Sequence, residues 1–353
     1  MIDNFLEILF LIKYPLIGLF FSFATLSFCW SYIFEILKLK SYDNVQRVHK
    51  HEIPRLGGLL IYFFFWIIHC LGYVKDDLFF HLLIAAIPFI LISLKEDLFH
   101  NSAPTNRLLA MILSCLIFFY VNPVVFPVID IPYVNVIISF YPISILFFTF
   151  SILVVMNGMN LIDGMNGLFS FSALFQLVAL SYIAFLNHDF ECLRLIFLIS
   201  AALVLFLFFN FPFGRIFAGD LGAYLYGFII SNITIYLFGK YNLSPTWLAV
   251  LILFYPCIEL LFSFIRKIKL NKSPFDPDNN HLHTLIYFNF IIMKMTHTQS
   301  ALLTTVFIIT FLNPLLWLSF INFEMLNVSI VIIFYSLLYV LLYKFFYLRK
   351  YYA

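Results

Sequence analysis

Long apolar runs separated by short polar breaks occupy most of the chain. A helix that crosses a lipid bilayer needs about 20 predominantly apolar residues, and runs of about this length, with several shorter ones, recur from end to end. The pattern therefore predicts an all-α, polytopic integral membrane protein. The eleven predicted spans are 16–37, 57–73, 79–94, 107–121, 136–156, 168–186, 194–209, 221–238, 247–265, 299–320 and 325–346.

The composition excludes a water-soluble globule. Hydrophobic residues make up 63% of the 353 positions and charged residues only 11%, whereas soluble domains have about 45–50% and about 25%. The breaks between the spans are too short to hold a separate soluble domain. We therefore predict that residues 1–353 form a single transmembrane domain.

The lysine and arginine residues predict which side of the membrane each break faces, because such residues are enriched in cytoplasmic loops. With the N-terminus outside and the C-terminus inside, sixteen of the 20 basic residues lie on the cytoplasmic side. The four exceptions are Lys13, Lys75, Arg194 and Lys240. The loops predicted to face the cytoplasm are 38–56, 95–106, 157–167, 210–220 and 266–298, and these loops hold nearly all of the polar chemistry.

The third span ends in two adjacent carboxylates, Glu96 and Asp97, and Arg107 opens the fourth. Adjacent carboxylates repel and burial disfavours their charged form, so at least one is a candidate base or Mg²⁺-associated ligand. A solvated helix end is the alternative, but negative charge at the C-terminal end of a helix is unfavourable. We favour a functional role.

The segment 156–168 contains three glycines and four polar candidates, Asn157, Asn160, Asp163 and Asn166, between two strongly apolar runs. Glycines let backbone amides approach a phosphate, and the side-chain oxygens suit Mg²⁺ or ribose hydroxyls. A plain turn would need only two or three such residues. The segment therefore indicates a binding loop.

A second glycine-flanked acid, Asp220, lies at the start of the eighth span. On the cytoplasmic edge it suits a metal ion shared with diphosphate oxygens. An aspartate at a helix start is also a common N-cap, and this position alone does not separate the two interpretations.

Four further candidates, in three segments, lie near the same side. Arg55 precedes Gly57-Gly58 in a basic loop, and for this segment alone contact with anionic lipid head groups is the favoured interpretation. His281 and His283, at i and i+2, do not share a helix face; zinc would need more ligands than the segment offers, so an anion clamp fits better. Glu259 is an intramembrane acid, a candidate for function or for a buried structural hydrogen bond. Together the loops predict a site for Mg²⁺ and a diphosphate beside lipid.

These motifs resemble, in the same order over about residues 45–300, those of the polyprenyl-phosphate N-acetylhexosamine-1-phosphate transferases, the WecA/MraY-like glycosyltransferase family 4. The segment KSPFDPDNNHLHT is closer to the WecA-type pattern than to the branch that makes the first peptidoglycan lipid. The resemblance implies transfer of a sugar-1-phosphate, from a UDP-N-acetylhexosamine to undecaprenyl phosphate. UMP would be released, and a lipid-linked cell-surface glycan would be initiated.

The resemblance also implies roles for individual residues. Glu96 and Asp97 match the family's Asp-Asp pair, which deprotonates or orients the lipid phosphate, with Glu96 standing where the family has Asp. Asn160 and Asp220 match Mg²⁺ ligands, for which Mn²⁺ is a possible substitute. The residues matched to nucleotide or diphosphate binding are Asn157, Asp163, Asn166, Arg107, His281 and His283. Asn166 stands where bacterial relatives commonly have Asp, and Thr284 replaces the last His of the motif.

The expected setting is the bacterial inner membrane, with the active site on the cytoplasmic face, no nucleic-acid partner and, by analogy, a homodimer. Two other interpretations remain. A transporter or flippase would need polar or broken helices near the midplane and often repeated halves, whereas no repeat is evident here. An inactive scaffold for glycan assembly would require the departures from the family pattern to be inactivating.

Overall fold

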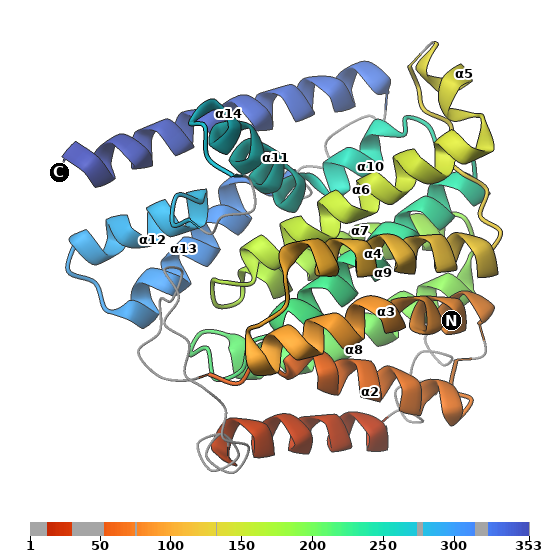
Figure 1. The fold of residues 1–353 in the computed structure, drawn as a ribbon, viewed down its shortest axis with the longest axis horizontal. Helices are drawn as coiled ribbons and strands as arrows, with labels where there is room; N and C mark the ends of the chain where they lie inside the picture. The colour runs from red at the N-terminus through yellow and green to blue at the C-terminus, as the bar shows by residue number, and fades with distance from the viewer. Residues whose placement is uncertain are drawn as a thin grey trace.

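Helices form the regular structure of the computed structural model, which describes residues 13–29, 53–74, 76–131, 133–273, 278–314 and 324–352 and has no strand in those ranges (Figure 1). The first described helix is Lys13–Cys29. The others are α2 (Gly57–Cys70), α3 (Asp77–Phe99), α4 (Pro104–Val121), α5 (Val134–Ile138), α6 (Tyr141–Ile162), α7 (Leu168–Leu186), α8 (Phe190–Asn210), α9 (Gly219–Lys240), α10 (Trp247–Ile252), α11 (Phe254–Lys269), α12 (Leu282–Ile292), α13 (His297–Phe311) and α14 (Met325–Tyr352).

Every predicted span overlaps a helix, and the all-α polytopic architecture is confirmed. Within the described ranges, seven helices are long and apolar enough to cross a membrane. The count of eleven and the orientation of the termini stay predictions. Residues 30–37 of the first span, 38–52 of the first loop and 315–320 of the tenth span lie outside the described residues.

Two of the predicted loops are partly helical. In the loop predicted at 95–106, α3 continues to Phe99, and in the loop predicted at 157–167, α6 continues to Ile162. Hydropathy marks where the apolar run stops, but a helix continues wherever its polar side chains find partners. The candidates Glu96, Asp97, Asn157 and Asn160 therefore lie on helical turns rather than in loops.

The predicted span 247–265 is two helices, α10 and α11, with a break at Leu253. Pro256 lies four residues after Ile252, the last residue of α10, so it has no N–H to continue the helical hydrogen bonding. The loop predicted at 266–298 also needs correction, because it contains the helix α12.

The helix α9 forms the centre of the molecule, and 94% of an 18-residue apolar stretch of this helix is buried. It packs against α2, α3, α6 and α7, and Figure 1 shows it behind α3, α4 and α6, with α14 along one edge of the molecule. Its apolar residues have no preferred face, which is typical of a helix surrounded by protein. By contrast, only 17% of an 18-residue apolar stretch of α14 is buried among the described residues, so most of this helix lies on the outside of the described structure.

Glycines allow the neighbours of α9 to approach closely. A Cβ at Gly58 of α2 would lie 2.2 Å from the Cα of Gly222, and one at Gly227 would lie 2.7 Å from the Cα of Met156 on α6. Small residues of this kind bring helix backbones together inside a bilayer. The first contact brings the residues before α2, including Arg55, next to the N-terminal end of α9.

Candidate active site

The first turn of α9 is held by two carboxylates from elsewhere in the chain. The backbone N–H of Gly219 donates to Asp163 Oδ2 at 3.2 Å. The N–H groups of Asp220 and Leu221 donate to Asp97 Oδ1 and Oδ2, both at 3.0 Å. The first backbone N–H groups of a helix have no partner within the helix and carry partial positive charge. Asp97 and Asp163 therefore cap α9 from α3 and from the end of α6.

Asp220 does not act as an N-cap, so that interpretation of the sequence is wrong. The capping position is Ala218, and Asp220 lies within the first turn with a side chain that is 4% exposed. Its Oδ1 accepts a hydrogen bond from Arg55 Nη2 at 3.0 Å, and its Oδ2 accepts one from Arg107 Nη1. The carboxylate is thus held between two guanidinium groups.

The paired acids Glu96 and Asp97 have different surroundings. The Asp97 side chain is fully buried, and Arg55 Nε lies 3.5 Å from its Oδ1. Glu96 is partly exposed, with Oε1 3.9 Å from Arg107 Nη1 and Oε2 accepting from the Ser102 backbone N–H at 2.8 Å. Of the two, Glu96 is the acid that a ligand can reach.

Among the described residues, four carboxylates and two guanidinium groups meet at this end of α9, so the acids outnumber the bases. The acids are Glu96, Asp97, Asp163 and Asp220, and the bases are Arg55 and Arg107. Burial raises the pKa of Asp163 well above its ordinary range, with Arg55 opposing that rise. A bound cation would stabilise the ionised form of such a cluster.

Asn160 lies beside this cluster, because its Nδ2 donates to the Tyr224 hydroxyl at 3.1 Å and Tyr224 is one helical turn after Asp220. No described residue donates a hydrogen bond to its amide oxygen. The oxygens of Asn160 and Asp220 are the hard donors that Mg²⁺ takes, and Mg²⁺ is usually bound by one or two carboxylates, waters and substrate phosphates. The residues present therefore fit a magnesium ion, although the described residues include no cage of three or more acidic, histidine or cysteine ligands.

Two other asparagines make contacts within the protein. Asn157 Nδ2 donates to the Leu153 carbonyl of its own helix at 2.8 Å. Asn166 is 1% exposed. Its side-chain Nδ2 donates to the Pro212 carbonyl at 2.9 Å, and its backbone carbonyl accepts from the Thr305 hydroxyl at 2.8 Å. Asn166 thus ties its segment to the α8–α9 connection and to α13. The nucleotide contacts expected for both residues stay predictions.

A second cluster surrounds Glu259 on α11. Its Oε1 accepts hydrogen bonds from His281 Nδ1 and the Leu282 backbone N–H, both at 3.1 Å. The rings of His281 and His283 stack with centroids 5.6 Å apart. Burial lowers the pKa of His283 to about 4, so near neutral pH His283 adds no positive charge to the predicted anion clamp.

The helix α6 contacts the elements of both clusters. Asn160 reaches Tyr224 on α9, while a Cβ at Gly158 would lie 2.3 Å from the Pro256 carbonyl oxygen on α11. The segment 157–163 therefore runs between α9, which carries Asp220, and α11, which carries Glu259.

Sequence reasoning did not single out Tyr224, Arg266 or Asp278 as site residues. Arg266 Nη2 lies 3.0 Å from Asp278 Oδ2, and Asp278 Oδ1 lies 3.5 Å from His281 Nε2. The position of Tyr224, four residues after Asp220, was the available signal for its place at the site. The available signals for the other two were also their positions. Arg266 lies two turns after Glu259, and Asp278 lies three residues before His281.

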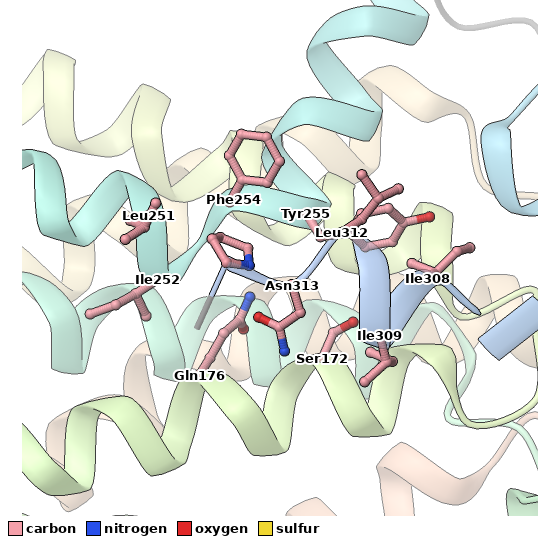
Figure 2. Close-up of a pocket in the computed structure, with 11 residues that line it drawn as sticks. Ser172, Gln176, Leu251, Ile252, Phe254, Tyr255, Ile308, Ile309, Leu312 and Asn313 are labelled. Carbon is pink, nitrogen blue, oxygen red and sulfur yellow. The ribbon is translucent and has the colours of Figure 1, made fainter. Parts of the chain in front are cut away.

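A small cavity between α7, α10, α11 and α13 is separate from these residues (Figure 2). Its volume is about 10 Å³, which is about the space for one water molecule. Gln176, Tyr255 and Asn313 help to line it, whereas none of the predicted site residues does. The cavity cannot hold a nucleotide or a sugar.

Comparison with known proteins gives one family match and relatives with similar names. Residues 79–238, from α3 to α9, match the model of glycosyl transferase family 4. The chain is 26% identical to the probable undecaprenyl-phosphate N-acetylglucosaminyl 1-phosphate transferase of Bacillus subtilis, over 73% of this chain and 71% of the relative.

Two further relatives have related names. The undecaprenyl-phosphate alpha-N-acetylglucosaminyl 1-phosphate transferase of Thermotoga maritima is 24% identical, over 67% of this chain and 69% of its own length. The Escherichia coli K12 protein of the same name is 28% identical over 39% of each chain. The matched region contains Glu96, Asp97, Asp163 and Asp220. The residues Arg55, Glu259, His281 and His283 lie outside it.

Proposed function

This chain belongs to glycosyl transferase family 4, and from that premise we propose that it transfers a sugar-1-phosphate from a UDP-sugar to a polyprenyl phosphate. The relatives' names support N-acetylglucosamine-1-phosphate as the group transferred and undecaprenyl phosphate as the acceptor. The observation that carries the proposal is the group of four carboxylates and two arginines at the N-terminal end of α9.

In the proposed reaction an oxygen of the lipid phosphate attacks the β-phosphorus of the UDP-sugar. A new P–O bond forms at that phosphorus, and its bond to the oxygen shared with the α-phosphorus breaks. UMP leaves with that oxygen, and a polyprenyl-diphosphate sugar remains. Catalysis of such a transfer consists mainly of positioning and neutralisation of charge.

The residues of the cluster have distinct roles in this proposal. Glu96 holds the proton taken from the lipid phosphate, because it is the accessible member of the acidic pair. Arg107 and Arg55 neutralise negative charge on the phosphates, and both also fix Asp220. Asp97 and Asp163 hold the first turn of α9 in place, so that these groups keep their positions.

We propose that Asp220 and Asn160 hold Mg²⁺, with Mn²⁺ as a substitute. When bound, the ion would supply positive charge to the diphosphate oxygens. The excess of carboxylates over guanidinium groups supports a cation here. The arginines at Asp220 would then contact phosphate and carboxylate together.

We place this site on the cytoplasmic face of a bacterial inner membrane. The support is the excess of lysine and arginine in the loops assigned to that side and the bacterial origin of the relatives. UDP-sugars are made in the cytoplasm, so the donor would reach the site directly.

The experiment is release of UMP by the purified protein with Mg²⁺ and undecaprenyl phosphate, with UDP-GlcNAc, UDP-GalNAc and related donors tested in parallel. Release that requires the lipid and occurs with one donor would establish the reaction and identify the sugar. A folded protein that releases no UMP with any of these donors would contradict the proposal.

A further inference from the structure

Glu259 is the most deeply buried acid of the histidine cluster, with 1% of its surface exposed. An acid inside a membrane protein is costly unless it is paired or hydrogen-bonded. Its Oε1 accepts two hydrogen bonds at 3.1 Å, from His281 Nδ1 and from the Leu282 backbone N–H, and its Oε2 lies 3.4 Å from the Tyr255 hydroxyl. The carboxylate thus joins α11 to the start of α12.

The two bonds to Oε1 fix both the backbone and the ring at one point. His281 is the capping residue of α12 but makes no side-chain cap itself, and Leu282 is the first residue of that helix. Glu259 therefore supplies the cap from another helix. The same oxygen orients the imidazole, because it accepts from Nδ1 and so requires the hydrogen to be on that nitrogen.

The other ring nitrogen is buried and lies beside a carboxylate. His281 Nε2 has no hydrogen-bond partner among the described residues, and the nearest acid, Asp278 Oδ1, lies 3.5 Å away. Asp278 is held in turn by Arg266 at 3.0 Å. Carboxylates that bind one nitrogen of a histidine commonly set the direction in which the other nitrogen points.

The last helix, α14, also contacts this arrangement. The Arg266 guanidinium lies 5.9 Å from the centre of the Tyr343 ring on α14. Lys350, near the end of α14, donates to Asn280 Oδ1 at 3.3 Å, one residue before His281. The segment 278–282 is thus held by α11 on one side and α14 on the other.

We propose that Glu259 is a positioning residue, which holds the His281 ring so that Nε2 faces the phosphate groups of the nucleotide-sugar donor. This inference rests on the proposed function, because that function supplies the nucleotide-sugar donor as the ligand of His281. Glu259 acts through His281 and does not contact the donor.

The kinetic test compares Glu259→Leu with Glu259→Gln, with the UDP-GlcNAc concentration varied. Gln keeps an oxygen that accepts from Nδ1 and from Leu282, so its kcat/KM should stay within a few-fold of the parent value. Leu removes both bonds, and kcat/KM should fall about 10- to 100-fold, the usual effect of losing a residue that orients a ligand. The matched controls are Glu191→Leu and Glu191→Gln at an exposed glutamate, which should leave kcat/KM unchanged.

Coupling to His281 separates positioning from general support of the fold. With His281→Ala already present, Glu259→Leu should change kcat/KM less than about twofold, because the ring that it positions is gone. The same fold loss with and without His281 would overturn the proposal, as would an equal loss in Gln and Leu variants.

Hydrogen exchange of residues 278–289 tests the contact without any catalysis. Glu259→Leu should speed exchange at the first turn of α12, whereas Glu259→Gln should not. Unchanged exchange in the Leu variant would overturn the positioning inference even in an active enzyme. A parent protein that releases no UMP, but shows the expected exchange, would overturn the proposed function and leave the Glu259 contact standing.

Discussion

Each end of α9 has a buried aspartate, and the two are satisfied in different ways. At the C-terminal end, Asp189 Oδ1 accepts from the Cys192 N–H at 3.1 Å. Its Oδ2 accepts from Lys240 Nζ at 2.8 Å, from the Tyr241 hydroxyl at 2.8 Å and from the Tyr236 hydroxyl at 3.1 Å. One negative charge meets one positive charge, and hydroxyls complete the shell.

At the N-terminal end, Asp220 belongs to a group with more acids than bases. Arg55 and Arg107 bind it, but three other carboxylates, Glu96, Asp97 and Asp163, lie within the same set of contacts. The group is anchored on the positive end of a helix, where anions are favoured.

The comparison separates an acid with a structural role from the acid for which we propose a function. The Asp189 cluster is complete without any ligand, so its contribution is to join α8 to α9. Among the described residues, the Asp220 cluster has more acids than bases, a partly exposed Glu96 and two arginines, which is the equipment for a cation and phosphates. Burial alone would not distinguish these two aspartates.

Removal of the metal should have the largest effect. In EDTA, lipid-dependent UMP release should fall by at least about 10³-fold, because the cation would supply most of the charge neutralisation at the Asp220 end. Added Mg²⁺ should restore the rate, and Mn²⁺ should do so in part. Full activity in EDTA after extensive dialysis would contradict the role given to the excess carboxylates.

Glu96→Gln should have the next largest effect, a fall in kcat of about 10²- to 10⁴-fold, as expected for loss of a general base. Gln keeps the size of the side chain and an oxygen for the Ser102 N–H but cannot hold the proton. Glu96→Asp, a matched change that keeps the carboxylate, should lose much less. The measurement is single-turnover UMP release, and equal rates for Gln and the parent enzyme would remove Glu96 from the proton transfer.

Asp97→Asn should affect stability and activity together. One carboxylate oxygen becomes an NH₂ group that faces a backbone N–H of α9, and the negative charge beside Arg55 is lost. We expect a loss of about 2–4 kcal/mol in the free energy of unfolding, seen as a lower Tm in detergent, and a smaller rate loss than for Glu96→Gln. An unchanged Tm would show that Asp97 does not cap α9.

Asp189→Asn should have the smallest effect on catalysis, with UMP release within about twofold of the parent rate and a cost of about 1–3 kcal/mol in stability. Burial raises the pKa of Asp189, but the hydrogen bond from Lys240, with the other contacts, outweighs burial and holds this pKa below its ordinary value. The parent protein should therefore keep this stabilisation above about pH 4 and lose it as the pH falls further. Thermal unfolding of both proteins between pH 3 and 7 measures the difference, and equal pH dependence would contradict the assignment.

The sequence was sufficient to predict the helices and most of the polar candidates. Apolar runs locate the helices, and the acids, asparagines and glycines that interrupt them lie near helix ends. The break at Leu253 was not predicted: Pro256 removes a helical N–H donor, but Pro88 does so inside the continuous helix α3, so a proline alone does not mark a break. Hydropathy could not reveal that α3 and α6 extend past their apolar runs.

The pairings could not be predicted, because they join distant positions. Asp97 binds the N–H of Asp220, 123 residues later, and Asp163 binds that of Gly219, 56 residues later. Nothing local distinguishes a capping acid from a ligand-binding acid, so the sequence predicts a catalytic role for Asp97 and a binding role for Asp163, whereas in the structure both cap α9. Likewise Glu259 and His281 are 22 residues apart, and only the fold shows that one holds the other.

The most direct test of the account is to compare Asp220→Asn with Asp189→Asn by formation of the polyprenyl-diphosphate sugar from UDP-GlcNAc and undecaprenyl phosphate with Mg²⁺. The account predicts that Asp220→Asn reduces product formation by at least about 10³-fold while the protein still folds, and that Asp189→Asn makes product at nearly the parent rate. Product formation at the parent rate by a folded Asp220→Asn protein would contradict the assignment of the α9 N-terminal cluster as the reaction centre.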